Sequence, residues 1–553
     1  MRTLKTYLGK DLVKATGMAT VAFTLVITVF AVIEPLREQG MSSSQAMRLF
    51  VYIMPVMFSL TLPIAALFAA TIVYGRFSRD NELMACRASG INALMLLRPA
   101  IWLGMVVSVI TLILGLYVAP RLMFVAEGSI KRNLRQIVYY RLKKKRYVDF
   151  SSRLFHADRV NTDEGWVEGV VGVDYSDGDD VKCLVAASAE LEFVKGKDDT
   201  FVRFHPTNPA FLSQSGKDIV TADAVRLRRG DLPSMKNEPK FYDWTMLCRT
   251  WKNPQNSPIV RREIIKIKQE VCIQNFYRDV INQIEKNGKY DCLKEFTLSD
   301  TQAEPDRIVI EASQASVHEN REVRLQTPPS GVSTLPSPNN SERHLVLVRQ
   351  YSGDRLNRRL WARSAYVRGA WDEEHSVVLV TVVLNDVTIA GAGERIENAQ
   401  HRGQYDISSL AVPDEIINES DRIDPGDLFE NASDYTDSPM VHNMISAVRQ
   451  STIPRLKSKV CAEIHQRLAY GIGCLLMVML GAALGLLFRG GEALVAFAIS
   501  AGPASAVIVL MLMGKQLIAN PGVPEGYGIV VVWGGIAVMA AATAYVYTVV
   551  MRR

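Results

Sequence analysis

Long apolar stretches lie towards both ends of this 553-residue chain, and its middle is charged and rich in turn residues. A helix that crosses a bilayer needs about 20 mostly apolar residues, because the hydrocarbon core cannot hydrogen-bond an exposed backbone group. The pattern predicts an α-helical membrane protein with six transmembrane helices in a three-plus-three arrangement, within residues 1–120 and 461–553. The six apolar stretches are residues 17–33, 49–73, 97–119, 468–488, 493–517 and 527–551.

The middle of the chain changes to a period-two pattern, which is typical of half-buried antiparallel strands. Apolar and polar residues alternate at 184–194, 308–325, 344–350 and 377–389. Residues 233–294 have a polar helical pattern, and 327–342 are rich in Pro, Ser and Asn. We therefore expect a large extracytoplasmic, mainly-β domain over residues 121–460, jellyroll-like, that carries a partly helical insertion at 233–342.

Basic residues are distributed unevenly among the loops of the predicted membrane regions. Four precede the first span, three lie in the loop at 74–96 and two end the chain, whereas the loop at 518–526 has none. Cytoplasmic loops carry an excess of Lys and Arg, and long translocated domains escape this rule. We therefore expect both termini and residues 74–96 in the cytoplasm, and the large middle domain outside.

Composition and motifs exclude several classes of function. The net charge of +6 is modest for this length and gives little support to nucleic-acid binding. The chain has no P-loop, GxSxG or HExxH motif, so ATP hydrolysis would belong to a separate subunit. Acidic residues are nearly absent from span centres, where an ion-coupled transporter would place them. Glu34 and Lys515 lie at span ends, from which their charged groups can reach the membrane interface.

We accordingly predict no catalytic residue, no metal site and no cofactor. The seven cysteines show no CxxC spacing. They leave one or two disulfides open if the middle domain faces an oxidising compartment.

One predicted cytoplasmic loop carries a distinct pattern, YGRFSRDNELMACRASG at residues 74–90. It has an acidic start, and Gly90 stands at a natural C-terminal stop, which predicts a short amphipathic helix over 76–90. Such a helix can lie on the membrane surface. Its mixture of Arg, Asp and Glu fits a contact with another protein at least as well.

A second motif, EIHQRL at residues 463–468, precedes the fourth predicted span. Together with residues 79–90 and the three-plus-three layout, it resembles the LptF/LptG (YjgP/YjgQ) permease family of the lipopolysaccharide-export ABC transporter. The resemblance implies a multi-pass protein of the bacterial inner membrane with a β-jellyroll in the periplasm. The middle domain is longer than the family jellyroll, and the excess is the predicted insertion. The resemblance does not distinguish LptF from LptG.

The resemblance also implies roles for particular residues. The helix at 76–90 would be a coupling helix that docks on an ATPase, with Glu82 at the acidic contact position. Glu82 can alternatively serve the dipole of its own helix. The coupling motif comprises Arg79, Glu82, Arg87 and Gly90, and the membrane-boundary signature comprises Glu463, His465 and Arg467. Glu463 and Arg467 are four residues apart, so they can alternatively form an ion pair on one helix face that has only a structural role.

Phosphorylated sugar head groups would need cations near the outer face. Arg37 and Arg48, beside the outer ends of the first two spans, are candidates. Residues 121–142 have the pattern of an amphipathic helix that ends in the basic run 143–146, which is either a solvated face or a further contact for anionic head groups.

The implied function is a permease subunit that extracts lipopolysaccharide, or a similar glycolipid, and passes it through the apolar groove of a jellyroll to a periplasmic bridge. The implied partners are an LptB-like ATPase dimer, a second LptF/LptG-like permease, LptC/LptA-like periplasmic proteins, lipopolysaccharide and the membrane. Two alternatives stay open. An FtsX/MacB-like mechanotransmission protein has four spans, and a membrane-anchored envelope protein that binds or senses a partner needs no coupling helix.

Overall fold

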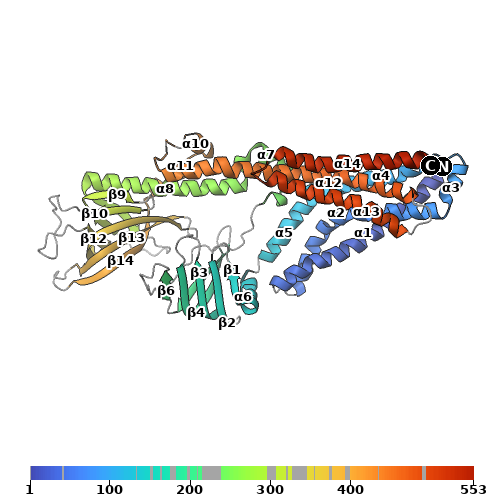
Figure 1. The fold of residues 1–553 in the computed structure, drawn as a ribbon. Helices are drawn as coiled ribbons and strands as arrows, with labels where there is room; N and C mark the ends of the chain where they lie inside the picture. Colours follow the sequence, from blue (N-terminus) through green and yellow to red (C-terminus); the bar gives the residue numbers. More distant parts are fainter. Residues whose placement is uncertain are drawn as a thin grey trace. The chain divides into compact units, whose positions relative to one another are not determined.

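The structure, a computed structural model, forms two compact units (Figure 1). Unit 1 comprises Met1–Pro254 and Pro454–Arg553, and unit 2 comprises Gln255–Ile453. The described residues are 2–552 apart from 40–42, 132–133, 150–152, 162–164, 175–181, 196–199, 208–209, 214–237, 296–306, 319–321, 327–345, 354, 373–376, 393–398, 432, 434 and 488–492.

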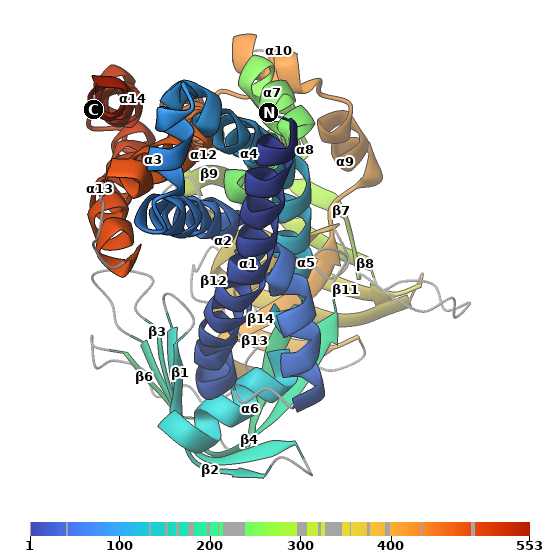
Figure 2. The same ribbon diagram turned by 90° about the vertical axis from the view of Figure 1, so that its right-hand side faces the viewer.

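Unit 1 contains the membrane helices. Within the described residues, six helical stretches are long and apolar enough to cross a bilayer, which confirms the three-plus-three prediction. Both chain termini lie at one end of this helical bundle, the end that faces the viewer in Figure 2. The helices are α1 (Arg2–Gln39), α2 (Ser43–Arg79), α4 (Ala93–Ile113), α12 (Ile453–Leu487), α13 (Ala493–Ala519) and α14 (Glu525–Arg552).

Small residues let α12 approach α2 closely. A Cβ atom on Gly481 would lie 2.9 Å from the backbone oxygen of Leu67, and one on Gly485 would lie 2.8 Å from that of Thr71. Lipid tails are as apolar as the helices, so membrane helices associate through such close packing rather than through a hydrophobic effect. The glycines of the fourth span therefore fix the α2–α12 contact.

The third span continues beyond α4. A π-helical turn, η1 (Leu114–Val118), leads into α5 (Ala119–Lys131), and a second helix, α6 (Leu134–Lys145), follows. The single amphipathic helix predicted over 121–142 is therefore divided between two helices. The apolar face of α6 supplies Val138, Tyr139 and Leu142 to the core of a six-stranded antiparallel sheet.

This sheet has the strand order β1-β2-β3-β4-β5, and β6 also pairs with β4. Phe155, Ala157 and Val170 face α6, so one side of the sheet is covered. The strands are β1 (Tyr147–Asp149), β2 (Arg153–Asn161), β3 (Trp166–Asp174), β4 (Lys182–Lys195), β5 (Thr200–Thr207) and β6 (Ala210–Ser213).

Unit 2 contains an eight-stranded antiparallel sheet with the order β11-β8-β7-β14-β13-β12-β10-β9. Strand β11 pairs with β12 as well as with β8, which closes six of the strands into a ring. The strands are β7 (Lys289–Glu295), β8 (Arg307–Glu311), β9 (Gln314–His318), β10 (Glu322–Gln326), β11 (Val346–Ser352), β12 (Arg355–Asp372), β13 (Val377–Gly391) and β14 (Gln400–Ala411).

Helix α8 (Pro258–Asn287) packs into this sheet. It begins at the N-cap Ser257, with Pro258 at its first position, and ends at Gly288 in the left-handed conformation. Its buried residues, among them Phe276 and Val280, share one core with the inward side chains of β13. The inner face of the sheet is therefore filled by a helix of the same chain.

The mainly-β character and the helical insertion are confirmed, with two differences in detail. Residues 308–325 form three short strands, β8, β9 and β10, rather than one stretch, and β9 and β10 pair as an antiparallel hairpin. The polar segment at 233–294 contains η2 (Pro239–Phe241), α7 (Trp244–Lys252) and α8, but its last residues belong to β7. Three helices, α9 (Asp414–Asp421), α10 (Pro425–Glu430) and α11 (Pro439–Ala447), follow β14, and the π-helical turn η6 (Val448–Thr452) joins α11 to α12.

Candidate functional site

A short helix, α3 (Glu82–Ala88), connects spans α2 and α4 at the end of the bundle where both termini lie (Figure 2). Asn81 before it has a φ of 60°, a left-handed conformation that Asn tolerates better than most residues. Its carbonyl accepts from the Ala85 N–H at 3.1 Å. Of the residues predicted as one helix over 76–90, Arg76 and Arg79 thus belong to the last turn of α2.

The C-terminal end of α3 has a defined stop. Gly90 adopts a φ of 73°, and the Ile91 N–H donates to the Cys86 carbonyl at 3.0 Å. This six-to-one bond across a left-handed glycine is a Schellman motif, and a side chain at that φ would be strained. Gly90 therefore ends the helix, as its position in the sequence predicts, and turns the chain towards α4.

One face of α3 is anchored to the bundle. Leu83 is buried and shares a core cluster with Tyr74 and Phe77 of α2. The Tyr74 hydroxyl donates to the Leu96 carbonyl at 2.7 Å, which ties α2 to α4 beside this contact. Burial, and after it the charge of Glu82, raises the pKa of the Cys86 thiol. A helix of seven residues thus has a fixed orientation.

The other face of α3 and the turn before it are exposed. Met84 is 49 % exposed, and Glu82 is half-buried at the helix start. Asp80 lies 3.6 Å from both Arg76 and Arg79, so the turn carries a mixed-charge surface. The side chain of Arg87 lies outside the described residues. The turn at 76–81 and helix α3 therefore form an exposed, mixed-charge surface at this end of the bundle.

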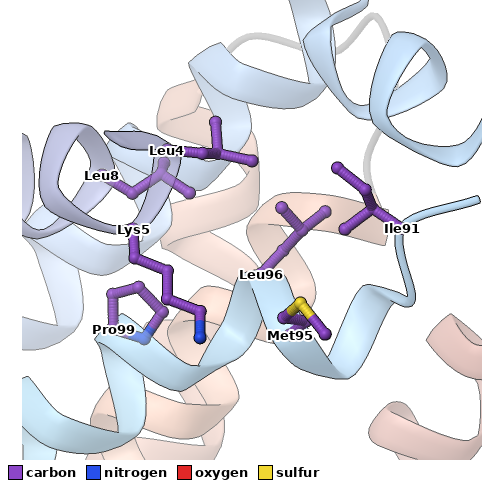
Figure 3. Close-up of a pocket in the computed structure, with 7 residues that line it drawn as sticks. All are labelled: Leu4, Lys5, Leu8, Ile91, Met95, Leu96 and Pro99. Carbon is purple, nitrogen blue, oxygen red and sulfur yellow. The ribbon is translucent and has the colours of Figure 1, made fainter. Parts of the chain in front are cut away.

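A small pocket lies beside this region, between α1 and the start of α4 (Figure 3). Lys5 is its one charged lining residue, and the rest of the lining is apolar: Leu4, Leu8, Ile91, Met95, Leu96 and Pro99. Ligand sites need several convergent polar groups to fix orientation. The pocket therefore does not have the chemistry of a substrate site.

Arg37 and Arg48 lie near the opposite ends of α1 and α2 from α3, and both side chains are exposed. The Lys144 ammonium of α6 donates to the Arg37 carbonyl at 2.9 Å, and the Tyr140 hydroxyl donates to the same oxygen at 3.4 Å. The structure thus brings one cation of the 143–146 run next to Arg37, a neighbour that sequence spacing did not reveal.

The boundary signature forms a buried ionic cluster. Glu463 is 7 % exposed, and its carboxylate lies 3.3 Å from the Arg467 guanidinium, as the i,i+4 spacing predicts. Its second oxygen lies 2.6 Å from the Lys515 ammonium of α13. Lys515 therefore forms an ion pair with Glu463 across two spans. A buried carboxylate needs such pairing because isolated burial costs several kcal/mol.

Two hydrogen bonds extend the contacts of α12 at this level. The Trp533 indole of α14 donates to the His465 ring at 3.0 Å. The Ser458 hydroxyl donates to the Glu525 carboxylate at the start of α14, at 2.6 Å. His465 is thereby used as an acceptor that aligns two spans. All three signature residues hold α12 in place.

Arg467 has further partners that sequence reasoning missed. Its guanidinium donates to the Tyr242 carbonyl at 2.7 Å and to the Lys240 carbonyl at 2.9 Å. These acceptors are backbone atoms of the segment that contains η2. A carbonyl has no residue-type signature, so no pattern in the sequence indicates these partners.

Next to these carbonyls, Asp243 caps α7 and pairs with the third span. It accepts from the Met246 N–H at 2.9 Å and from the Thr245 hydroxyl at 2.7 Å, and it lies 2.8 Å from the Arg121 guanidinium. The Thr245 hydroxyl and the Arg121 guanidinium hold the pKa of the Asp243 carboxyl well below its usual range, at about 2. Burial raises the pKa of the neighbouring Tyr242 to about 12.

No group of His, Cys, Asp and Glu in the described part of the chain could hold a metal ion. Six cysteines whose side chains are described, Cys86, Cys183, Cys248, Cys272, Cys461 and Cys474, are free thiols.

The sequence matches the family model described as lipopolysaccharide export system permease LptF/LptG, over residues 6–211 and 336–549. The match covers most of the chain, including the α3 loop and the boundary cluster, and leaves out 212–335. No curated protein matches the sequence. Six apolar helices and this match together identify a multi-pass inner-membrane protein. The chain therefore belongs to the LptF/LptG family of lipopolysaccharide export permeases, whose members are transport components rather than enzymes.

Proposed function

We propose that this chain is one permease subunit of an ABC transporter that extracts lipopolysaccharide, or a similar glycolipid, from the inner membrane. It would pass the lipid to a periplasmic bridge of LptC/LptA-like proteins towards the outer membrane. ATP would be hydrolysed by a separate LptB-like dimer, and a second LptF/LptG-like permease would complete the transporter. Both termini and α3 would face the cytoplasm, and the β-sheets would face the periplasm.

The observation that carries this proposal is the construction of α3. Its apolar side is locked into the bundle through Leu83, while Glu82, Met84 and the charged turn remain accessible. A coupling helix transmits movement between two proteins. Its buried face must therefore be held firmly by the membrane helices, and its exposed face must fit the surface of the ATPase. Arg79, Glu82, Arg87 and Gly90 would then serve docking, with Gly90 acting through the shape of the helix end.

Head groups would meet cations at the opposite end of the spans. Arg37 and Arg48 are exposed there, and Lys144 approaches the Arg37 backbone. Phosphates bind guanidinium and ammonium groups through charge-assisted hydrogen bonds. We propose that these side chains contact the phosphorylated sugars of the lipid.

The acyl chains would use the six-stranded sheet. Helix α8 fills the inner face of the eight-stranded sheet, so that face is closed to them. The side of the six-stranded sheet that faces away from α6 carries accessible apolar residues, Leu154, Val171, Val173 and Val185. An apolar surface of this kind lowers the cost of moving acyl chains through water.

Replacing Glu82 tests the coupling role. We expect Glu82→Ala to weaken co-purification of the ATPase about tenfold, which corresponds to ~1.4 kcal/mol. The measurement is the amount of ATPase retained on the tagged permease complex, together with lipid release from proteoliposomes. The matched control is Glu285→Ala, an exposed glutamate of α8 in unit 2, which should retain the ATPase fully.

A third variant separates contact from helix stability. Glu82→Asp keeps a negative charge at the start of α3 but shortens its reach. If Glu82 served only the helix dipole, Asp would restore ATPase binding. Normal binding and normal release with Glu82→Ala would refute the coupling assignment.

A further inference from the structure

Two covalent connections join unit 1 to unit 2. The chain leaves unit 1 at Pro254, after η2 and α7, and returns at Pro454, at the start of α12. Both connections can carry a displacement of the membrane helices to unit 2. The contacts that hold each connection to the membrane helices therefore decide whether the two connections move together.

Arg467 holds the outgoing connection to α12. Its guanidinium donates to the carbonyls of Lys240 and Tyr242, and the same group pairs with Glu463 one helical turn earlier. Its side chain is 11 % exposed, so water has little access to the guanidinium and competes little for these hydrogen bonds. The returning connection is α12 itself. The Arg467 side chain thus links the outgoing segment at residues 240–242 directly to α12, the returning connection.

Three contacts with α5 hold the same segment from another side. Asp243 pairs with Arg121 at 2.8 Å, and Lys240 lies 3.9 Å from Glu127. The rings of Phe241 and Phe124 pack edge to face, with centroids 5.9 Å apart. Tyr242 and Phe241 are buried. Residues 239–243 are therefore fixed to the third and fourth spans together.

We propose that Arg467 is a positioning residue for transport: it makes the two connections to unit 2 move as one body with the outer ends of α5 and α12. This inference rests on the proposed function and deepens it. The segment that Arg467 holds lies within residues 212–335, outside the family match. Arg467 thus ties a segment outside the family match to the membrane helices.

The shape of the arginine guanidinium allows Arg467 to bond both carbonyls at once. Its planar guanidinium presents five donors in a fixed geometry, whereas the lysine ammonium is a compact point charge. Arg467→Lys keeps a cation beside Glu463 but loses the simultaneous reach to two carbonyls. In Arg467→Gln, Glu463 still keeps Lys515 as its partner, at 2.6 Å, so its carboxylate is not left unpaired.

The test uses the complete transporter in proteoliposomes and measures lipid released per ATP hydrolysed, at equal amounts of assembled complex. We expect Arg467→Gln and Arg467→Lys to lower this ratio at least about fivefold, the lower end of usual coupling between sites. Both should retain the ATPase. Asp243→Asn, which keeps the cap of α7 but removes the charge that faces Arg121, should lower the ratio less. Arg261→Gln, an exposed arginine of α8, is the matched control and should keep the wild-type ratio.

The outcomes separate the two proposals. A wild-type ratio in Arg467→Gln overturns the positioning role, and so does full restoration of the ratio by Arg467→Lys, because a charge alone would then suffice. If the wild-type protein itself retains no ATPase and releases no lipid, the proposed function fails instead. A lower yield of complex with an unchanged ratio would show that Arg467 is only structural.

Discussion

At Asp243, one carboxylate performs two tasks, since it caps α7 and pairs with Arg121. Its folded-state pKa, about 2, is below the usual 3.8, so the charged form is favoured by folding. The stabilisation is fully present above the usual pKa and is lost as the pH falls from 3.8 towards 2. Because the Arg121 side chain is exposed, the effect is modest, at most ~1 kcal/mol.

The pH dependence of thermal unfolding checks this assignment. In detergent at about pH 6, Asp243→Asn should melt below the wild type, because the amide keeps the cap but loses the charge. The difference in apparent melting temperature should shrink as the pH is lowered through 3.8. A difference that stayed constant down to the lowest pH would mean that the charge of Asp243 contributes nothing.

Single residues also show where sequence reasoning succeeds. The Glu463–Arg467 pair follows from i,i+4 spacing, and Gly90 follows from helix-stop chemistry, because both depend on neighbours in the chain. The pairing of Lys515 with Glu463 joins two spans, and the carbonyl partners of Arg467 lie more than two hundred residues away. Such partners depend on tertiary packing, which no local pattern encodes.

At the scale of elements, the apolar spans were predictable because bilayer thickness sets their length. The strands of the middle domain were predictable as a class, since alternation reveals a half-buried strand but not its partner. Hence the pairing of β11 with both β8 and β12, and the division of strands between two sheets, came only from the structure. The polar surface of α8 likewise gave no sign that its other face completes a β core.

Helix α8 provides a stability prediction. Phe276 is fully buried between α8 and the sheet, in edge-to-face contact with Tyr290. Phe276→Ala should destabilise unit 2 by ~3–5 kcal/mol, because it leaves a cavity in a closed core. Amide hydrogen exchange of β13 in the full-length protein is the measurement, with the exposed α8 variant Glu285→Ala as the control. Unchanged protection of β13 would show that α8 is not part of the core of the sheet.

For the whole molecule, the decisive question is which side of the membrane each part faces. The basic loops predict a cytoplasmic position for α3, and the structure places both termini at the same end of the bundle as α3. ATP is available only in the cytoplasm, so the proposed coupling function requires the same orientation. The pattern of basic loops and the shared end of the bundle thus support the orientation that the proposed function requires.

Thiol labelling in cells tests this topology directly. In a background that lacks the native cysteines, Met84→Cys of α3 and Val317→Cys of β9 each offer an accessible thiol, since these positions are 49 % and 43 % exposed. A membrane-impermeant maleimide added to spheroplasts should label Val317→Cys at once and Met84→Cys only after the membrane is permeabilised. Labelling of Met84→Cys from outside would separate α3 from every cytoplasmic ATPase, and the coupling mechanism would then be impossible whatever the fate of Glu82.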